Sequence, residues 1–312
     1  MNAVAPGDQL LAILRGHRIE EGRLWETAAM VGTQPIISNV SDTAWWVAAY
    51  RAIESARPDA LFHDPLANRL AGERGRAIVA ATPRVMRGGW WLVARTKIID
   101  DLIAEAIRDG CDRALTLAVG LDTRPYRLDL PSDFTWFEAD LPELLAEKEH
   151  LLADQRPRCR LTTRAVDLAD PAARDAFLDE ALSGATKALV LTEGLLMYLE
   201  PHDVWALSHA LKRQEIAWWI LDFSGPRLRK RMNTKGRGMM QNAPFKFAPP
   251  NGLTYFEDLG WTTVDVESVF MAAHRLHRLP MWLRHLTYLP QPDPRSPRDR
   301  PWSAMTVARL TP

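Results

Sequence analysis

Between residues 112 and 225, short apolar segments alternate with helix-like ones, and this alternation limits the possible folds more than any other feature of the chain. The apolar segments are short and rich in branched and aromatic side chains, as is typical of buried strands. They cover residues 113–120, 134–140, 160–167, 187–193 and 215–222. Helix-like segments at 142–155, 171–182 and 201–213 separate the last four. The alternation predicts a mostly parallel α/β sheet with helices on both faces.

The chain before residue 109 has a different character. Apolar residues recur at helical spacing from Trp45 to Ile53, and again from Leu92 to Ile107 before Gly110. We therefore predict a helical cap or lid over residues 1–108. Residues 109–312 are predicted to form the ligand-binding α/β domain, with a loop-rich basic insertion at about 225–252. Strand-like segments at 260–270 and 303–312 complete the sheet, with a late antiparallel strand.

The strand-like segments end in a glycine or in acidic residues. These ends are Gly120, Glu138 with Asp140, Asp167, Glu193 and Asp222. One aspartate at a strand end often only caps or turns the chain. The repeated pattern is more informative, because the ligands of open parallel sheets bind beyond the carboxyl ends of the strands. The sequence therefore predicts a ligand site at that edge of the sheet.

The loop after the first strand, "LAVGLDTRPYRL" (117–128), contains a single glycine, Gly120. Glu138 and Asp140 follow about 20 residues later, where an acid that binds a ribose diol is expected. A nicotinamide dinucleotide carries a pyrophosphate, which favours a loop with several glycines. S-adenosylmethionine (SAM) has no phosphate and needs only one close approach of the chain. The loop therefore favours SAM, and no triphosphate-binding motif is present.

Several segments resemble those of one known family. "LAVGLDTRPYRL", "FEADLPELLAEK", "AVDLAD" and "LTEGLLMYL" resemble, in order, motifs of the leucine carboxyl methyltransferase family, and in particular its bacterial branch with the tetracenomycin-type polyketide O-methyltransferases. "SDTAWWVAAYRAIESARPDALFHDPLANRLAG" and "RTKIID" resemble the helical N-terminal region of that branch. The resemblance runs from about residue 40 to about 225, and "LGW" near 260 also fits. It implies a Rossmann-like class I methyltransferase sheet with a helical cap, and SAM as cofactor.

The resemblance also implies roles for individual residues. Arg95, at the start of "RTKIID", matches the arginine that binds the SAM carboxylate. Asp140 matches the acid that binds the ribose, and Asp167 with Leu168 matches the pair that contacts the adenine. Glu193 matches an acid near the methionyl amino group. The other residues predicted to bind the cofactor are Ala118, Gly120, Asp122 and Glu138.

Two departures from the family pattern bear on function. The family loop commonly reads Gly-Ala-Gly, whereas this chain has Ala118-Val119-Gly120, which leaves open a non-catalytic SAM-binding protein. The eukaryotic branch, which methylates a protein C-terminus, has a lysine where this chain has Trp45 and Trp46. We therefore favour a small-molecule acceptor over a protein carboxyl group. Trp45 and Trp46 are predicted to contact the substrate, with an aromatic face near the sulfonium.

The predicted reaction is O-methylation of a carboxylate or a phenolic hydroxyl on a small, partly apolar secondary metabolite. A carboxylate is already charged, whereas a phenol would benefit from a general base. Tyr198, His202 and His63 are candidates for that base by side-chain type only. In the basic insertion, Arg229 and Arg231 are predicted to bind an acidic or carrier-bound acceptor, the alternative being a solvated loop.

Charge and composition argue against several other partners. The chain has 39 Lys and Arg residues against 39 Asp and Glu residues, so no global field attracts nucleic acid. No apolar run approaches the ~18 residues of a membrane span, and residues 1–18 do not resemble a signal peptide. Cys111 and Cys159 cannot build a disulfide framework. We therefore expect a cytoplasmic protein, and no metal because no cluster has metal-ligand spacing.

Overall fold

The computed structural model of the chain describes residues 30–31, 34–35, 37–82, 88–235, 240–296 and 305–312. Residues 1–29 of the predicted cap and residues 236–239 of the basic insertion lie outside the described part. A short antiparallel pair, β1 (Met30–Val31) and β2 (Gln34–Pro35), precedes the main body of the fold.

A seven-stranded sheet forms the centre of the molecule, in the order β5-β4-β3-β6-β7-β9-β8. Neighbouring strands from β5 to β7 are parallel, and β9 runs antiparallel to both β7 and β8. The predicted fold class is therefore confirmed, including the late antiparallel strand. The strands are β3 (Arg113–Leu117), β4 (Thr135–Asp140), β5 (Arg160–Ala165), β6 (Ala188–Thr192), β7 (Ile216–Ser224), β8 (Thr262–Ser268) and β9 (Met305–Thr311).

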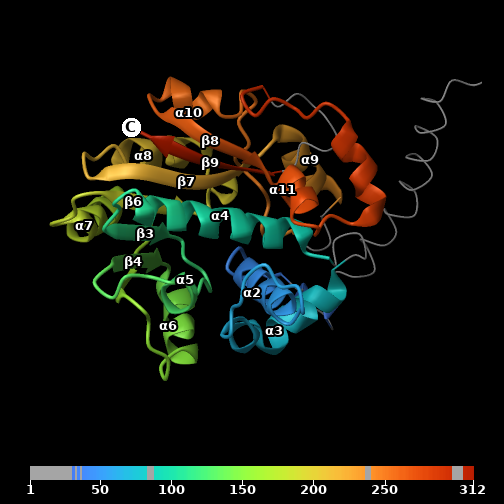
Figure 1. Ribbon diagram of the computed structural model, residues 1–312, viewed down its shortest axis with the longest axis horizontal. Coiled ribbons are helices and arrows are strands. Elements are labelled where there is room, and N and C mark those ends of the chain that lie inside the picture. Colours follow the sequence, from blue (N-terminus) through green and yellow to red (C-terminus); the bar gives the residue numbers. More distant parts are fainter. Residues whose placement is uncertain (1–29, 32–33, 36, 83–87, 236–239, 297–304) are drawn as a thin grey trace, which may run out of the picture.

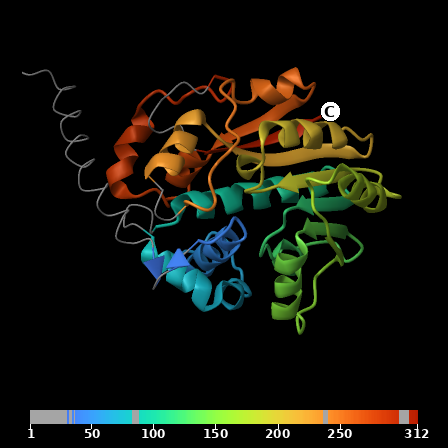
Figure 2. The ribbon, with the colours of Figure 1, turned by 180° about the vertical axis from the view of Figure 1, so that it is seen from behind.

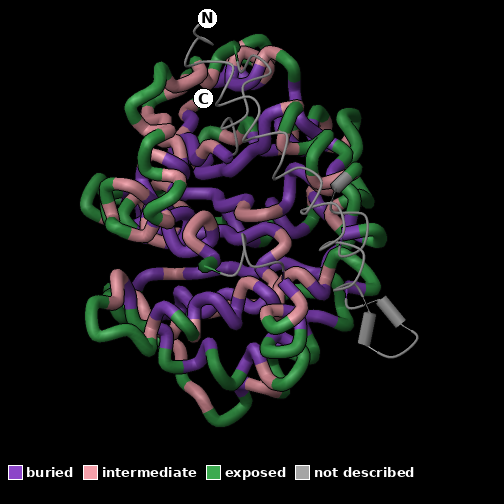
Figure 3. The backbone as a smooth tube through the Cα atoms, turned by 90° about the vertical axis from the view of Figure 1, so that its right-hand side faces the viewer, coloured by how far each residue is buried: buried purple, intermediate pink, exposed green. Residues whose placement is uncertain are grey.

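Different helices cover the two faces of the sheet. α4 (Trp90–Arg108) and α11 (Val269–Arg275) cover one face, and α7 (Pro171–Leu182), α8 (Pro201–Ala210) and α10 (Thr254–Asp258) cover the other (Figures 1 and 2). Because side chains alternate along a strand, the adjacent residues Trp218 and Trp219 of β7 enter opposite cores. Figure 3 shows the buried chain concentrated in the central strands and the exposed chain on the outside.

The helices of the N-terminal part have two different roles. Ile98, Ile99 and Ile103 of α4 are buried in the core that covers the sheet, so this helix is part of the sheet's packing although its residues fall in the predicted cap. α2 (Asp42–Ser55) and α3 (Ala67–Ala81) contribute Trp46 and Ile78 to the same core, and they also share a second, smaller core. That core also contains Leu121, after β3, and Leu144 of α6 (Pro142–Leu151). This core packs α2 and α3 against the segments that follow the carboxyl ends of β3 and β4.

The basic insertion was predicted to be loop-rich, but it begins with the helix α9 (Pro226–Lys235). Pro226 suits the first helical position, since its missing N–H has no partner there. Leu228 and Met232 lie one turn apart and pack against the main core, which gives the helix an apolar side. After the helix, residues 240–252 run without regular structure. No helix in the described ranges is long and apolar enough to cross a membrane.

Candidate functional site

A cavity of about 1060 Å³ lies at the carboxyl ends of the parallel strands. This is at the upper end of the roughly 300–1,000 Å³ typical of small-molecule pockets. Loops after the strands, the helices α2, α4 and α9, and the 3₁₀ segment η2 (Met281–Tyr288) form its wall. Among the predicted site residues, it brings together Trp46, Arg95, Ala118, Gly120, Asp122, Asp140, Asp167, Leu168, Glu193, Tyr198 and Arg231.

The loop after β3 holds a backbone shape that L-residues rarely adopt. Ala118 has φ 56° and Gly120 has φ 55°. At Gly120 an added Cβ would also lie 3.3 Å from the Cβ of Ala44 in α2. The Gly120 N–H donates to Asp140 Oδ2 at 2.6 Å, and the Leu141 N–H donates to Oδ1 at 2.7 Å. Asp140 therefore fixes the loop while its carboxylate lines the cavity, and burial raises its pKa.

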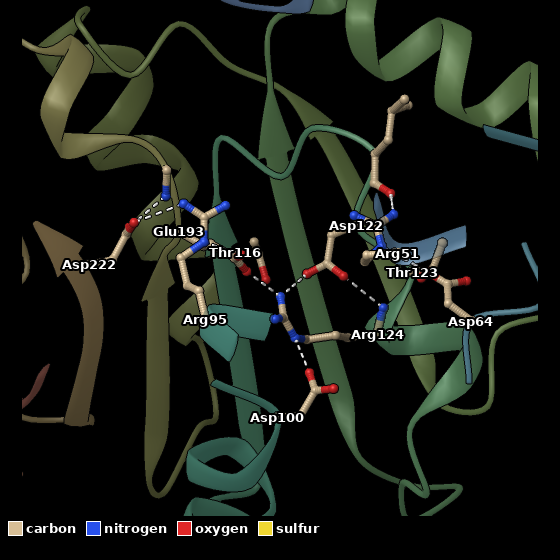
Figure 4. A network of polar contacts seen from close by, with 12 residues as sticks. Arg51, Asp64, Arg95, Asp100, Thr116, Asp122, Thr123, Arg124, Glu193 and Asp222 are labelled. Atoms are coloured by element: carbon tan, nitrogen blue, oxygen red, sulfur yellow. Dashed lines mark hydrogen bonds and ion pairs between the residues drawn. The ribbon is translucent and has the colours of Figure 1, made fainter. Parts of the chain in front are cut away.

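Arg124 of α5 (Arg124–Arg127) is the centre of a buried charge network below this loop (Figure 4). Its Nε lies 2.8 Å from Asp100 Oδ1, and its Nη1 lies 2.6 Å from Asp122 Oδ2 and 2.7 Å from Glu193 Oε2. Burial by itself would raise the pKa of Asp122, but the positive charges of Arg124, Arg127, Arg51 and Lys148 together outweigh burial and hold that pKa well below its usual range. Both Asp122 and Glu193 therefore stay ionised.

Arg95 of α4 continues the network toward β7. Its Nε lies 2.9 Å from Glu193 Oε1, and its Nη1 lies 2.9 Å from Asp222 Oδ2. Asp222 also accepts a 2.6 Å hydrogen bond from the Gly194 N–H, so the turn after β6 is fixed in the same way as the loop after β3 (Figure 4). An arginine has five N–H donors, so these ion pairs leave donors on a guanidinium that also lines the cavity.

Aromatic side chains form the next part of the wall. Trp46 lies against Trp91 with ring centroids 6.1 Å apart, and Trp90 contacts both Trp91, at 5.7 Å, and Phe270, at 5.9 Å. These edge-on contacts hold the rings in place. Four methionines also line the cavity, namely Met197, Met232, Met240 and Met305. Their flexible thioethers let this part of the cavity adapt to an apolar ligand.

Tyr198, one of the predicted candidates for a base, lines the same part of the cavity. Burial raises the pKa of its phenol to about 12, although its side chain is hydrogen bonded to Thr43. The phenol is therefore protonated at neutral pH, and it suits the role of a hydrogen-bond donor better than that of a base.

Two residues predicted to bind ligands turn away from the cavity. Glu138 is fully buried and forms an ion pair with Lys148 of α6 at 2.6 Å, so it does not reach the cofactor side as Asp140 does. Trp45 does not line the cavity, and the guanidinium of Arg74 lies 4.6 Å from its ring centroid. Adjacent residues on a helix point about 100° apart, which explains why Trp46 faces the cavity and Trp45 does not.

Three further predicted residues face solvent. Arg229 lies on the outer side of α9 and donates to the Lys246 carbonyl oxygen at 2.9 Å. His63 and His202 are exposed, and neither lines the cavity. The two histidines are therefore excluded as bases at this site, and no histidine of the described ranges lines it. Within the same ranges, no group of three potential ligands is arranged to hold a metal ion.

Sequence reasoning missed several residues that form the site. Arg124 stands inside the quoted loop "LDTRP", and Asp222 was recognised at a strand end, but neither was assigned a role. Trp90 and Trp91 are adjacent tryptophans, but nothing local in the sequence shows that Trp91 meets Trp46. The sequence marked these positions only by an unusual residue type. The distances in the structure were needed to show what each residue contacts.

Known proteins resemble this chain over much of its length. The family described as leucine carboxyl methyltransferase matches residues 44–212, just over half of the chain. A protein of Rhodococcus jostii, provisionally named an SAM-dependent methyltransferase, is 38% identical over 174 residues, which cover 53% of this chain and 58% of that protein. A protein of Frankia alni with the same provisional name is 36% identical over 212 residues, covering 64% and 71%. The chain thus spans little more than half the length of most such relatives.

Two crystal structures share the fold. A protein of Thermobifida fusca YX, described provisionally as a methyltransferase, aligns with TM-score 0.52 and 15% identity, covering 86% of this chain and 93% of that one. A DUF574 family protein of Streptomyces avermitilis aligns with TM-score 0.50 and 16% identity, covering 85% and 96%.

Proposed function

Because this chain belongs to the leucine carboxyl methyltransferase family, we propose that it is an SAM-dependent O-methyltransferase that converts a carboxylate of a small, partly apolar metabolite into a methyl ester. SAM supplies an electrophilic methyl group, whose bond to sulfur breaks with the electron pair left on sulfur while an acceptor oxygen forms the new bond. One observation carries the proposal. A single cavity joins the loop after β3 to the aromatic wall, so cofactor and acceptor share one enclosed space.

The residues near the strand ends suit SAM better than a phosphate-bearing cofactor. Asp140 presents a buried carboxylate with no ion-pair partner among the described residues, which suits two hydroxyl donors of a ribose and repels a phosphate. Arg95 would bind the carboxylate of the methionyl part, next to Glu193 for its amino group. Asp167 and Leu168, which both line the cavity, would contact the adenine.

The acceptor side favours a carboxylate over a phenol. No histidine of the described ranges lines the cavity, and Tyr198 stays protonated. The carboxylates of the wall already accept hydrogen bonds or ion pairs, as Asp140 does from Gly120 and Glu193 does from Arg124. A phenol would therefore have no free base, whereas a carboxylate needs none.

The contribution of the protein to the reaction is alignment and exclusion of water. Trp46, Trp90 and Trp91 hold a rigid apolar wall, and the Tyr198 hydroxyl can donate to an acceptor oxygen and orient it. The Trp46 ring face offers a cation–π contact to the positive sulfonium, worth about 0.5–2 kcal/mol.

The test is an untargeted methylation screen. The protein is incubated with SAM carrying a labelled methyl group and with cell extract, and labelled products are separated by mass spectrometry. We expect a labelled small molecule that releases labelled methanol in mild alkali, because methyl esters hydrolyse there and aryl methyl ethers do not. Asp140→Ala is the control, and it should lose both SAM binding in calorimetry and labelling.

Other outcomes would overturn the proposal in distinct ways. Alkali-labile label on a polypeptide would identify a protein carboxyl methyltransferase, and an alkali-stable product would exclude a carboxylate as the methylated group. SAM binding without any labelled product would identify a non-catalytic SAM-binding protein. Absence of SAM binding would refute the cofactor itself.

A further inference from the structure

The part of the cavity wall formed by α9 carries positive charge. Arg227, Lys230, Arg231 and Thr234 line the cavity, and their i, i+3, i+4 and i+7 spacing places them on one side of the helix. Arg229 lies on another side of the helix and donates to the Lys246 carbonyl oxygen. The helix thus presents a row of cations to the cavity and a further cation away from it, and the cations of the row are also exposed to solvent.

Two cations of this row, Lys230 and Arg231, have no ion-pair partner in the ranges that the structure describes. Because both cations line the cavity, an anion bound there would gain charge-assisted hydrogen bonds from them. The chain as a whole has a formal net charge of +0, so the excess of positive charge is local to this wall.

The acidic residues of the cavity lie elsewhere. Asp122, Asp140, Asp167 and Glu193 all lie at or after the carboxyl ends of the parallel strands. Figures 1 and 2 show α9 near α11, away from α2 and α3. Acids and the arginines Arg51, Arg95 and Arg124 therefore share the part of the cavity where the cofactor is proposed to bind, whereas the charged residues that α9 contributes to the wall are all cations.

Apolar side chains border the basic row. Leu228 and Met232 of α9 line the cavity next to the cations, and Trp282, Leu283 and Leu286 of η2 line it as well. A ligand that contacts this wall therefore meets apolar surface and positive charge together, which suits an apolar body that carries a negative group.

We propose that Lys230 and Arg231 form an anion subsite, and that the methyl acceptor is an amphipathic acid with a negative group separate from the carboxylate that is methylated. The identification of the bound anion as the acceptor rests on the proposed function. The anion subsite itself does not, because it follows from the charges of the wall.

The experiment compares two fluorescent probes of nearly equal shape. 1-Anilinonaphthalene-8-sulfonate is an apolar aromatic anion, and N-phenyl-1-naphthylamine is its uncharged counterpart. Both are titrated into the full chain with and without S-adenosylhomocysteine, whose own binding is measured by calorimetry. The variants are Lys230→Gln with Arg231→Gln, and Arg229→Gln as the matched control on the solvent side of the same helix.

We expect the double variant to raise the Kd of the anionic probe about tenfold, which is the size expected from two partly exposed ion pairs. The Kd of the uncharged probe should change less than about twofold, and Arg229→Gln should change neither. Added salt should weaken binding of the anionic probe to the unaltered protein but not to the double variant.

Equal loss of both probes would show a packing effect and overturn the subsite, as would an unchanged Kd for the anionic probe. Failure of S-adenosylhomocysteine to bind would refute the proposed function while leaving the probe comparison valid. Once an acceptor is known, the double variant should raise KM and leave kcat nearly unchanged, since the subsite binds the acceptor away from the reacting oxygen.

Discussion

Replacing Arg124 by methionine tests whether the buried charge network holds the site together. Asp100 would keep its ion pair with Arg127 at 2.7 Å, and Glu193 would keep Arg95 at 2.9 Å. Asp122 would lose its one ion-pair partner among the described residues while its side chain remains only 10% exposed. Breaking a buried pair in this way costs about 3–5 kcal/mol, because it leaves an uncompensated buried charge.

The measurement is urea unfolding followed by tryptophan fluorescence, for which the chain has 12 tryptophans. Arg164→Met is the control, because Arg164 and its partner Glu180 have side chains 46% and 45% exposed. An exposed pair contributes about 0–1 kcal/mol. Adding Asp122→Asn to Arg124→Met should recover part of the lost stability, because it removes the unpaired charge.

The pH dependence gives a second check. In the unaltered protein the pKa of Asp122 is lowered, so its contribution to stability is present above the unfolded pKa of about 3.9 and is lost as the pH falls through the folded pKa. In Arg124→Met, the lowering effect of this guanidinium is lost while those of Arg127, Arg51 and Lys148 remain, so the folded pKa of Asp122 rises above its value in the unaltered protein. The deficit in unfolding free energy should therefore be full at pH 7 and shrink as the pH falls through the folded pKa of Asp122 in the variant. A deficit below about 1 kcal/mol, or one equal to that of Arg164→Met, would refute the reasoning.

Three further predictions follow from the cavity and the cores. Ala118→Gly should raise the unfolding free energy by about 0.5–1 kcal/mol, because glycine adopts φ 56° without the penalty of an L-residue, and should tighten SAM binding; weaker binding in calorimetry would contradict this. Tyr198→Phe should lower the methylation rate up to about tenfold, the value of one hydrogen bond, without altering its pH profile between about 6 and 9, because the phenol has a pKa of about 12; loss of an alkaline limb would show that Tyr198 titrates in catalysis. Burial raises the pKa of Cys111 to about 11 and that of Cys159 to about 12, so a thiol-specific disulfide reagent at pH 8 should react slowly until urea unfolds the chain; rapid reaction in the folded state would contradict their burial.

Much of the fold was predictable because its signals are local. Four of the five parallel strands coincide with an apolar segment, while the strand β5 is polar, and the helices after β4, β5 and β6 each begin at a proline. The exceptions were α4 and α9. α4 has the apolar stripe of any helix, and only its contacts show that it packs on the sheet as well as against α2. α9 was not predicted as a helix because its many cations are typical of a solvated loop. Leu228 and Met232 are its apolar residues that pack against the main core.

The site, like the fold, has features that local sequence predicts and features that only tertiary contacts decide. The sequence by itself determined that a lone glycine and a series of acidic residues end the strands, because strand ends and turns depend on neighbouring residues. Only the tertiary structure decided which of two similar neighbours faces the cavity, as with Trp46 against Trp45 and Arg231 against Arg229. That choice depends on the elements packed around each helix. The joining of Arg124 to Asp100, Asp122 and Glu193 likewise required segments far apart in the chain to meet, and such contacts leave no periodic signal in the sequence.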